Sequence, residues 1–216
     1  MLETTIDVIV VSFFIVPMLL ALSDPGEADV EFGESAGFSI VVALFLAAYG
    51  VYRRESFRLD ARRTLVRYFV FMLGWVPLFI ILYPYLVRLI GAELAPQKAV
   101  EYFASGPQGG GLWMSVAMVC VAAPVAEEIL FRGILFRLMG SVANPATALV
   151  TTSVLFGLVH EPSVRIPVTF LGFLFGYLRL RSGGVGASIL AHIVHNSLTV
   201  GAFLAWPELL EMMYEK

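Results

Sequence analysis

The dominant pattern along the chain is a series of long apolar stretches separated by short polar segments. About 20 consecutive apolar residues cross the hydrocarbon core of a bilayer as a helix, and several stretches reach that length. The pattern predicts seven helical spans, at about 5–22, 36–52, 66–90, 112–139, 144–160, 166–180 and 187–206. We therefore expect an all-α, polytopic transmembrane helical bundle in the lipid bilayer, with residues 1–216 forming one integral membrane domain.

Two shorter signals refine this pattern. Pro96 can open a short amphipathic helix that continues to about Ser105, and we expect this helix to lie at the membrane interface. Asn144 followed by Pro145 is typical of a helix N-cap with proline at the first helical position. The fifth span should therefore begin at this pair.

The composition supports a membrane protein. Of the 216 residues, 59% are hydrophobic and 14% are charged, whereas about 25% of a typical soluble domain is charged. The formal net charge is −3, and no basic surface indicates a nucleic-acid partner. The one cysteine, Cys120, excludes an internal disulfide, and we expect a small packing residue there rather than a nucleophile.

The positions of the arginines predict the orientation, because cytoplasmic loops are enriched in positive charge. Ten arginines are assigned to the cytoplasmic side, and only Arg88, Lys98, Arg165 and Lys216 to the other. This places the N-terminus in the cytoplasm, in a multi-pass protein of the plasma (inner) membrane. The first span is not expected to be a cleaved signal, since Glu3 and Asp7 precede it without a positive charge. The ten are Arg53, Arg54, Arg58, Arg62, Arg63, Arg67, Arg132, Arg137, Arg179 and Arg181.

The fourth predicted span contains charged side chains where the bilayer disfavours them. An ionisable group at the centre of a span costs on the order of 3 kcal/mol on insertion, so such groups usually mark function. Glu128 and Arg132 are four residues apart on a helix and can form a salt bridge. Glu127 is rotated by about 100° from Glu128, so it can face a different cavity and remain available for proton chemistry.

All three histidines of the chain lie in apolar spans or at their ends. Phe156 and His160 are four residues apart, so the phenyl ring can pack beneath the imidazole. His192 and Asn196 are also four apart and point in the same direction. His195 lies about 60° from His192 around the helix, and we expect it to face a neighbouring helix. A single histidine in a membrane usually bridges helices, but this set together indicates catalysis.

Several familiar membrane-protease motifs are missing from the sequence. It has no Gly-x-Ser-x-Gly motif and no pair of intramembrane aspartates, and Val164 interrupts the H-E-x-x-H pattern that begins at His160. A glutamate removed from water becomes a stronger base near neutral pH. A water between Glu127 and His160 could then attack an amide carbonyl, and His192 and Asn196 could donate hydrogen bonds to the developing oxyanion.

Together these residues resemble the CAAX-protease and bacteriocin-processing (CPBP, or Abi) family of intramembrane glutamic endopeptidases. Its three motifs match Glu127-Glu128…Arg132, Phe156…His160 and His192…Asn196, within a core of about residues 112–206. The resemblance implies a helical intramembrane fold and a glutamate-dependent hydrolase. By analogy, Glu127 is the base, His160 assists the water, and His192 with Asn196 forms the oxyanion site. Glu128, Arg132 and Phe156 support them.

Alternatives remain open at this point. Two histidines and a glutamate also match a catalytic zinc site, but Asn196 is a poor zinc ligand, so we expect no metal or other cofactor. A non-enzymatic immunity or scaffold protein on the same fold is another possibility. A proton-coupled transporter is a third, although the chain has no evident paired repeat. For a protease, the partner would be a membrane-embedded or lipid-anchored peptide or protein substrate, whose identity the sequence does not specify.

Overall fold

The computed structural model describes Tyr49 and residues 56–214. This part of the chain is helical and contains no strand, as expected for the predicted fold class. Four of its helices are long and apolar enough to cross a membrane, and the protein is an integral membrane protein. The predicted spans at about 5–22 and 36–52 lie outside the described residues.

The first long helix runs from Ala61 to Leu89 and contains 29 residues. It begins five residues earlier than the predicted start at 66, because the Asp60 side chain accepts a hydrogen bond from the Arg63 amide and caps it. Large apolar side chains such as Leu73, Ile81 and Leu89 are exposed along it, as expected of a surface that faces lipid. Its segments are α4 (Ala61–Val76), a π-helix (Pro77–Leu82) and α5 (Tyr83–Leu89).

The second long helix runs from Gly110 to Val142 and contains two π-helical stretches. At the end of the first stretch, the Ala123 amide donates to the Met118 carbonyl, five residues earlier. The same pattern would pair the Val119 carbonyl with the amide of residue 124, but this residue is a proline and has no N–H. Val119 therefore needs a donor from elsewhere. The segments are α7 (Gly110–Ala117), π-helix Met118–Ala122, α8 (Ala123–Glu128), π-helix Ile129–Leu135 and α9 (Phe136–Val142).

The remaining predicted spans also appear as helices. The fifth is α10 (Pro145–Leu158), and the Asn144 side chain caps it by accepting from the Thr147 amide at 2.9 Å, which confirms the predicted start. Its 14 residues are about 21 Å long, shorter than the roughly 30 Å hydrocarbon core. The 3₁₀ turn η5 (Pro162–Val164) leads into α11 (Arg165–Ser182), and α12 (Gly186–Ala205) follows.

Two short helices lie outside these spans. The predicted interfacial helix is α6 (Lys98–Ala104). It begins at Lys98, two residues after Pro96, which was expected to open it. The reason is that Gln97 has an extended backbone and serves as the N-cap residue. The last helix of the described part is α13 (Leu209–Tyr214).

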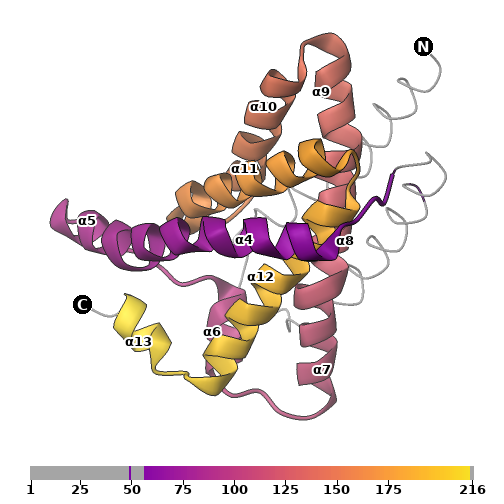
Figure 1. The fold of residues 1–216 in the computed structure, drawn as a ribbon. Helices are drawn as coiled ribbons and strands as arrows, with labels where there is room; N and C mark the ends of the chain where they lie inside the picture. The colour runs from indigo at the N-terminus through magenta and orange to yellow at the C-terminus, as the bar shows by residue number, and fades with distance from the viewer. Residues whose placement is uncertain (1–48, 50–55, 215–216) are drawn as a thin grey trace.

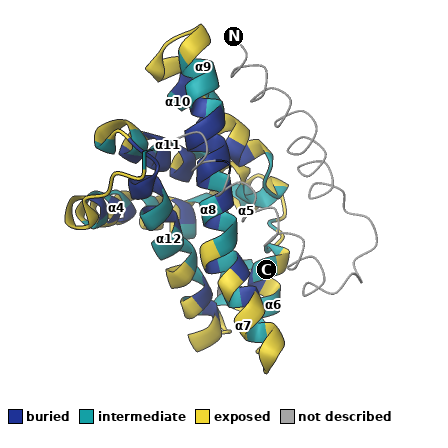
Figure 2. Ribbon diagram, turned by 90° about the vertical axis from the view of Figure 1, so that its right-hand side faces the viewer, coloured by how far each residue is buried: buried dark blue, intermediate teal, exposed yellow. Residues whose placement is uncertain are grey.

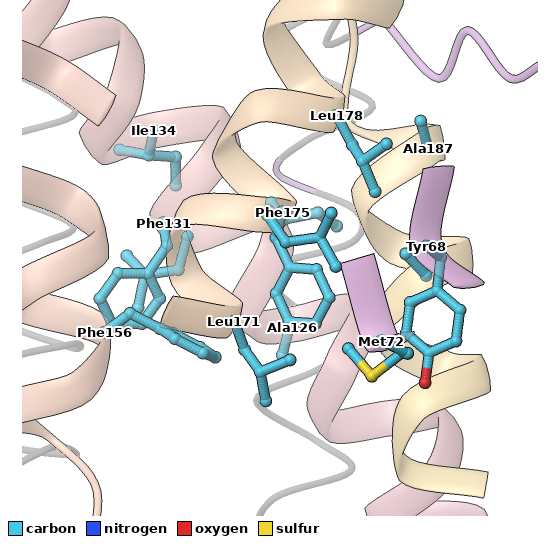
Figure 3. Packing of buried hydrophobic residues seen from close by; sticks show 14 of the residues in the cluster. Tyr68, Met72, Ala126, Phe131, Ile134, Phe156, Leu171, Phe175, Leu178 and Ala187 are labelled. Carbon is cyan, nitrogen blue, oxygen red and sulfur yellow. The ribbon is translucent and has the colours of Figure 1, made fainter. Parts of the chain in front are cut away.

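The core lies where α8 and the π-helix after it meet α10, α11 and α12 (Figure 1). Figure 2 shows buried residues gathered at this crossing, with exposed residues toward the ends of the helices. Phe131, Phe156 and Phe175 are all nearly inaccessible to solvent, and their side chains lie close together in Figure 3. α10 and α11 pack so closely that a Cβ atom at Gly172 would lie 3.0 Å from the Cα of Ser153. A rigid crossing of this kind holds the polar side chains described next.

Candidate active site

A fully buried ion pair lies at the centre of the core. Arg132 Nη1 is 3.0 Å from Glu128 Oε1, and neither side chain is exposed, which confirms the predicted salt bridge. Arg132 Nη2 also donates to the Gly172 carbonyl at 2.9 Å. The guanidinium lies 4.3 Å from the centre of the Phe156 ring, an arrangement that favours a cation. The buried charge is therefore held by a carboxylate, a carbonyl and an aromatic face.

His192 connects this ion pair to the second glutamate. Its Nδ1 atom is 3.0 Å from Glu128 Oε1, and its Nε2 atom is 3.8 Å from Glu127 Oε2. An ionised carboxylate can only accept, so Nδ1 carries the proton and Nε2 faces Glu127. The imidazole stacks on the Phe175 ring with 4.7 Å between centroids. Glu128 thus orients His192 as well as Arg132, a contact that helical spacing could not predict.

The two glutamates occupy different environments, although they are adjacent in sequence. The Glu128 side chain is fully buried, whereas 31% of the Glu127 side chain is exposed. Glu127 Oε2 lies 3.8 Å from His192 Nε2, a distance too long for a direct hydrogen bond. Glu127 is therefore accessible and lies close to an imidazole. Both properties are needed if this carboxylate is to activate a water molecule for attack.

His160 lies just past the end of α10 and completes this group. Its Nδ1 atom is 2.6 Å from the Phe156 carbonyl. A carbonyl can only accept, so Nδ1 carries the proton and Nε2 of the neutral ring has a free lone pair. The Phe156 ring packs against the imidazole at 4.8 Å, as predicted from their spacing. Glu127 and His192 are both close enough to His160 to influence it electrostatically.

Asn196 and His192 both face the long helix Gly110–Val142, but Asn196 contacts an earlier part of that helix. Its Nδ2 atom donates to the Val119 carbonyl at 2.9 Å. This is the carbonyl that Pro124 leaves without a backbone donor, so the side chain of α12 replaces the missing N–H. One of the two amide protons is committed to this bond. Only the other is available for the predicted oxyanion role.

His195 is separate from this group. Its Nδ1 atom is 3.2 Å from the Tyr68 hydroxyl, and its ring meets the Trp75 ring edge to face. This confirms the expectation that it faces a neighbouring helix, which is α4. It borders an apolar cavity of about 520 Å³ between α4, α11, α12 and α13. Glu127, His160 and His192 do not line that cavity.

Besides the contact between Glu128 and His192, three contacts at the site were not predicted from the sequence. They are the Phe175 ring on His192, the Gly172 carbonyl on Arg132 and the Val119 carbonyl on Asn196. Two of these are backbone carbonyls, which any residue type supplies. A phenylalanine in an apolar span likewise carries no chemical signal of its own. Only Pro124 gave a usable clue, because a proline inside a helix always leaves a carbonyl without its amide donor.

The zinc alternative can be compared with the geometry. Within the described residues, no three side chains among His, Cys, Asp and Glu form a group that could hold a metal ion. The residue after His160 is Glu161, as in a zinc-binding helix, but it accepts a hydrogen bond from the Lys98 amide on α6 instead. These observations lend no support to the metal alternative, and the expected absence of a cofactor stays a prediction.

Comparisons with known proteins bear on the family rather than on the roles of these residues. Residues 109–198 match the family model described as "Type II CAAX prenyl endopeptidase Rce1-like". The chain is also 31% identical over 88 residues to the "Putative membrane peptidase YdiL" of Bacillus subtilis (strain 168). That match covers 40% of this chain and 36% of the relative, so the chain spans about a third of the relative it matches. No solved structure matches. The resemblance predicted from the three motifs is thus confirmed.

Proposed function

With residues 109–198 taken as an Rce1-like region, we propose that this chain is an intramembrane peptidase in which Glu127 activates the attacking water. The observation that carries the proposal is the contrast between the glutamates. Glu128 is fully buried and shared by Arg132 and His192, whereas Glu127 is accessible beside the His192 imidazole. Such a division separates a carboxylate that maintains the structure from one that can exchange protons.

The reaction proposed is hydrolysis of a peptide bond. Glu127 takes a proton from a water molecule while the oxygen of that water forms a bond to the scissile carbonyl carbon. The Nε2 lone pair of His160 accepts a hydrogen bond from the same water and orients it. When the carbon–nitrogen bond breaks, the proton held by Glu127 passes to the leaving nitrogen. The immediate products are a carboxylic acid and an amine, and Glu127 is ionised again. Transfer of the acid proton to the amine then gives a carboxylate and an ammonium group, so atoms and charges balance.

The negative charge that develops on the carbonyl oxygen needs donors. In its doubly protonated form His192 carries an N–H at Nε2, and Asn196 has one amide proton beyond the bond to Val119. We propose that these two groups form the oxyanion site. Glu128 holds His192 at Nδ1 in either protonation state, because that nitrogen carries a proton in both.

The substrate proposed is a membrane-embedded or lipid-anchored polypeptide. An apolar chain has room in the 520 Å³ cavity on the neighbouring face of α12, a volume within the range of small-ligand pockets. The matching family is described as a prenyl endopeptidase family. A prenyl group would supply an apolar chain of this kind. We therefore expect the apolar anchor to contribute to binding and the four proposed catalytic side chains to contribute to turnover.

A purified, detergent-solubilised preparation tests this function. The probe is an internally quenched peptide that ends in a prenylated cysteine followed by three residues, compared with the same peptide without the prenyl group. We expect the wild-type protein to cleave the prenylated probe with the lower KM and Glu127→Ala to cleave neither. Cleavage by Glu127→Ala at the wild-type rate would contradict the proposed base. If neither probe is cut, membrane peptides that accumulate in cells carrying Glu127→Ala would identify the substrate, and no such accumulation would reject the peptidase.

Metal analysis of the same preparation tests the proposal that no metal takes part. We expect less than stoichiometric zinc in active protein and unchanged cleavage after treatment with a membrane-permeant chelator. One zinc ion per chain that is lost and restored together with activity would replace glutamate-activated water by a zinc mechanism. The site residues would remain the same in that case.

A further inference from the structure

The turn that follows His160 is held from outside by a segment distant in sequence. Ser163 Oγ donates to the Ala95 carbonyl at 2.7 Å. The Glu161 side chain accepts from the Lys98 amide at 3.3 Å. Gln97, the cap residue of α6, makes no side-chain cap hydrogen bond, so Glu161 satisfies an amide that the helix itself leaves open.

The same segment is anchored on the helix that carries His192. Val100 and Phe103 of α6 are buried in one cluster with Val200 and Phe203 of α12. Figure 1 shows α6 alongside α12. Because α12 is a continuous helix of 20 residues, a group fixed against its later turns is also fixed relative to His192. Residues 95–104 thus connect the turn after His160 to α12.

His160 needs such support because it lies beyond the last residue of α10, Leu158. On its N-terminal side it keeps the hydrogen bond from its amide to the Gly157 carbonyl. Its own carbonyl accepts from Arg165 Nε at 3.1 Å. A displacement of about 1 Å in a catalytic group can cost on the order of 100-fold in rate. The position of the imidazole therefore depends on how firmly the η5 turn is held.

We propose that residues 95–104 form a brace that sets the spacing between His160 and His192, with Ser163 and Glu161 as positioning residues. Neither touches the reacting atoms; each acts through His160, so the inference rests on the proposed function. Burial and the charge of Glu161 together raise the pKa of Tyr214 on α13. Tyr83 of α5 contacts the same turn, donating to the Ser163 carbonyl. The turn after His160 therefore lies among α5, α6 and α13, which all contribute residues to the apolar cavity.

The test uses the full-length protein in detergent and measures how fast diethyl pyrocarbonate modifies each histidine, by mass spectrometry. The chain has 3 histidines, so every site is resolved. Ser163→Ala and Glu161→Ala remove a hydrogen bond worth about 1 kcal/mol, and we expect His160 to be modified about fivefold faster. His192 and His195 should keep their wild-type rates. Ser163→Thr and Glu161→Gln keep the donor and the acceptor and should restore the wild-type rate at His160.

Matched controls are Glu101→Ala on the brace and Ser105→Ala directly after it. Ser105 and Glu101 are both exposed, and the Ser105 hydroxyl donates to the Tyr102 carbonyl rather than to the η5 turn. These two variants should leave all three histidines unchanged. Unchanged His160 reactivity in Ser163→Ala and Glu161→Ala would overturn the brace. Equal acceleration of all three histidines would also overturn it, because that result indicates general loosening of the fold.

Turnover of the prenylated probe separates the brace from the proposed function. Loss of the brace should lower kcat about tenfold and leave KM unchanged, because binding of the apolar anchor does not depend on His160. A change in KM alone would contradict a positioning role. If wild-type protein fails to cleave any substrate while His160 alone responds to the brace variants, the proposed function fails and the structural connection stands.

Discussion

At the scale of single residues, the main feature is that one buried carboxylate supports two partners. Glu128 Oε1 lies 3.0 Å from both Arg132 Nη1 and His192 Nδ1. Its other oxygen has no protein partner in the described part of the chain. Removing the charge of Glu128 would therefore disturb the buried Arg132 cation and the His192 ring together. Removing the charge of Glu127 would affect only the accessible side of the site.

The first prediction follows from this difference. Glu127→Gln should abolish cleavage and leave the thermal unfolding midpoint in detergent close to that of the wild type. Glu128→Gln should lower both, because an uncompensated buried Arg132 costs roughly 3 kcal/mol or more. Thermal unfolding and turnover measured on the same preparations check this. Equal midpoints and equal residual activities in the two variants would show that the glutamates do not have separate roles.

At the scale of elements, the π-helical turn before Pro124 explains where α12 docks. The Val119 carbonyl lacks a backbone donor there, and Asn196 supplies one at 2.9 Å. Asn196 can therefore serve in docking, in stabilising the oxyanion, or in both. The two roles differ in whether a restored backbone amide can replace the side chain.

The second prediction uses that difference. Asn196→Ala should lower activity by roughly 100- to 1,000-fold, the usual effect of removing an oxyanion donor, and should also lower stability. Adding Pro124→Ala to Asn196→Ala supplies an amide that can bond to Val119, so the thermal midpoint should recover. Activity should stay low. Recovery of both would mean that Asn196 acts only in docking α12.

The close contact between α10 and α11 gives a third prediction. Gly172→Ala would place a methyl group 3.0 Å from the Cα of Ser153, and backbone atoms cannot easily move aside. We expect a lower thermal midpoint, since overpacking typically costs about 1–3 kcal/mol, and reduced activity because the Gly172 carbonyl holds Arg132. Gly201→Ala is the control: a Cβ there has nothing within 4 Å, so its midpoint should be unchanged or higher. A Gly172→Ala midpoint equal to that of the control would refute close packing as the cause.

At the scale of the whole molecule, the structure groups the charges in the way the orientation argument requires. The Val185 amide donates to the Ser56 carbonyl at 2.7 Å, so the segment with Arg58 lies beside the turn that follows Arg179 and Arg181. At the other end, Arg88 donates to the Met213 carbonyl, and Arg165 to the His160 carbonyl. These cations, assigned to opposite sides of the membrane, are thus found at different ends of the helices. Arg132 is the exception: it was assigned to the cytoplasmic side, but it is buried in the core because it pairs with Glu128.

The fourth prediction concerns this topology. In a Cys120→Ala background, single cysteines at Arg58 and Arg181 should react with a membrane-impermeant maleimide only from the cytoplasmic side. A cysteine at Lys98 should react only from the opposite side. All three positions are exposed, so labelling should be efficient in oriented vesicles. Labelling of Arg58 and Lys98 positions from one side would mean that the helix Ala61–Leu89 does not cross the bilayer.

The sequence by itself determined the class of the protein and the chemical identity of its site. Apolar length predicted each long helix in the described part, because a segment in lipid must satisfy its backbone internally. Helical spacing was enough for contacts within one helix, such as Glu128 with Arg132 and Phe156 with His160. Rotation about the helix axis also placed His195 away from His192 correctly.

Only the tertiary structure decided how separate helices meet. The contact between His192 and Glu128 joins residues 64 positions apart, and no periodicity relates two helices to each other. The partners of Arg132, Asn196 and Ser163 include backbone carbonyls of Gly172, Val119 and Ala95. A carbonyl has the same chemistry at every position, so its role depends on packing alone. Sequence therefore specified which side chains are proposed to react, and the crossing of the helices decided what holds them in place.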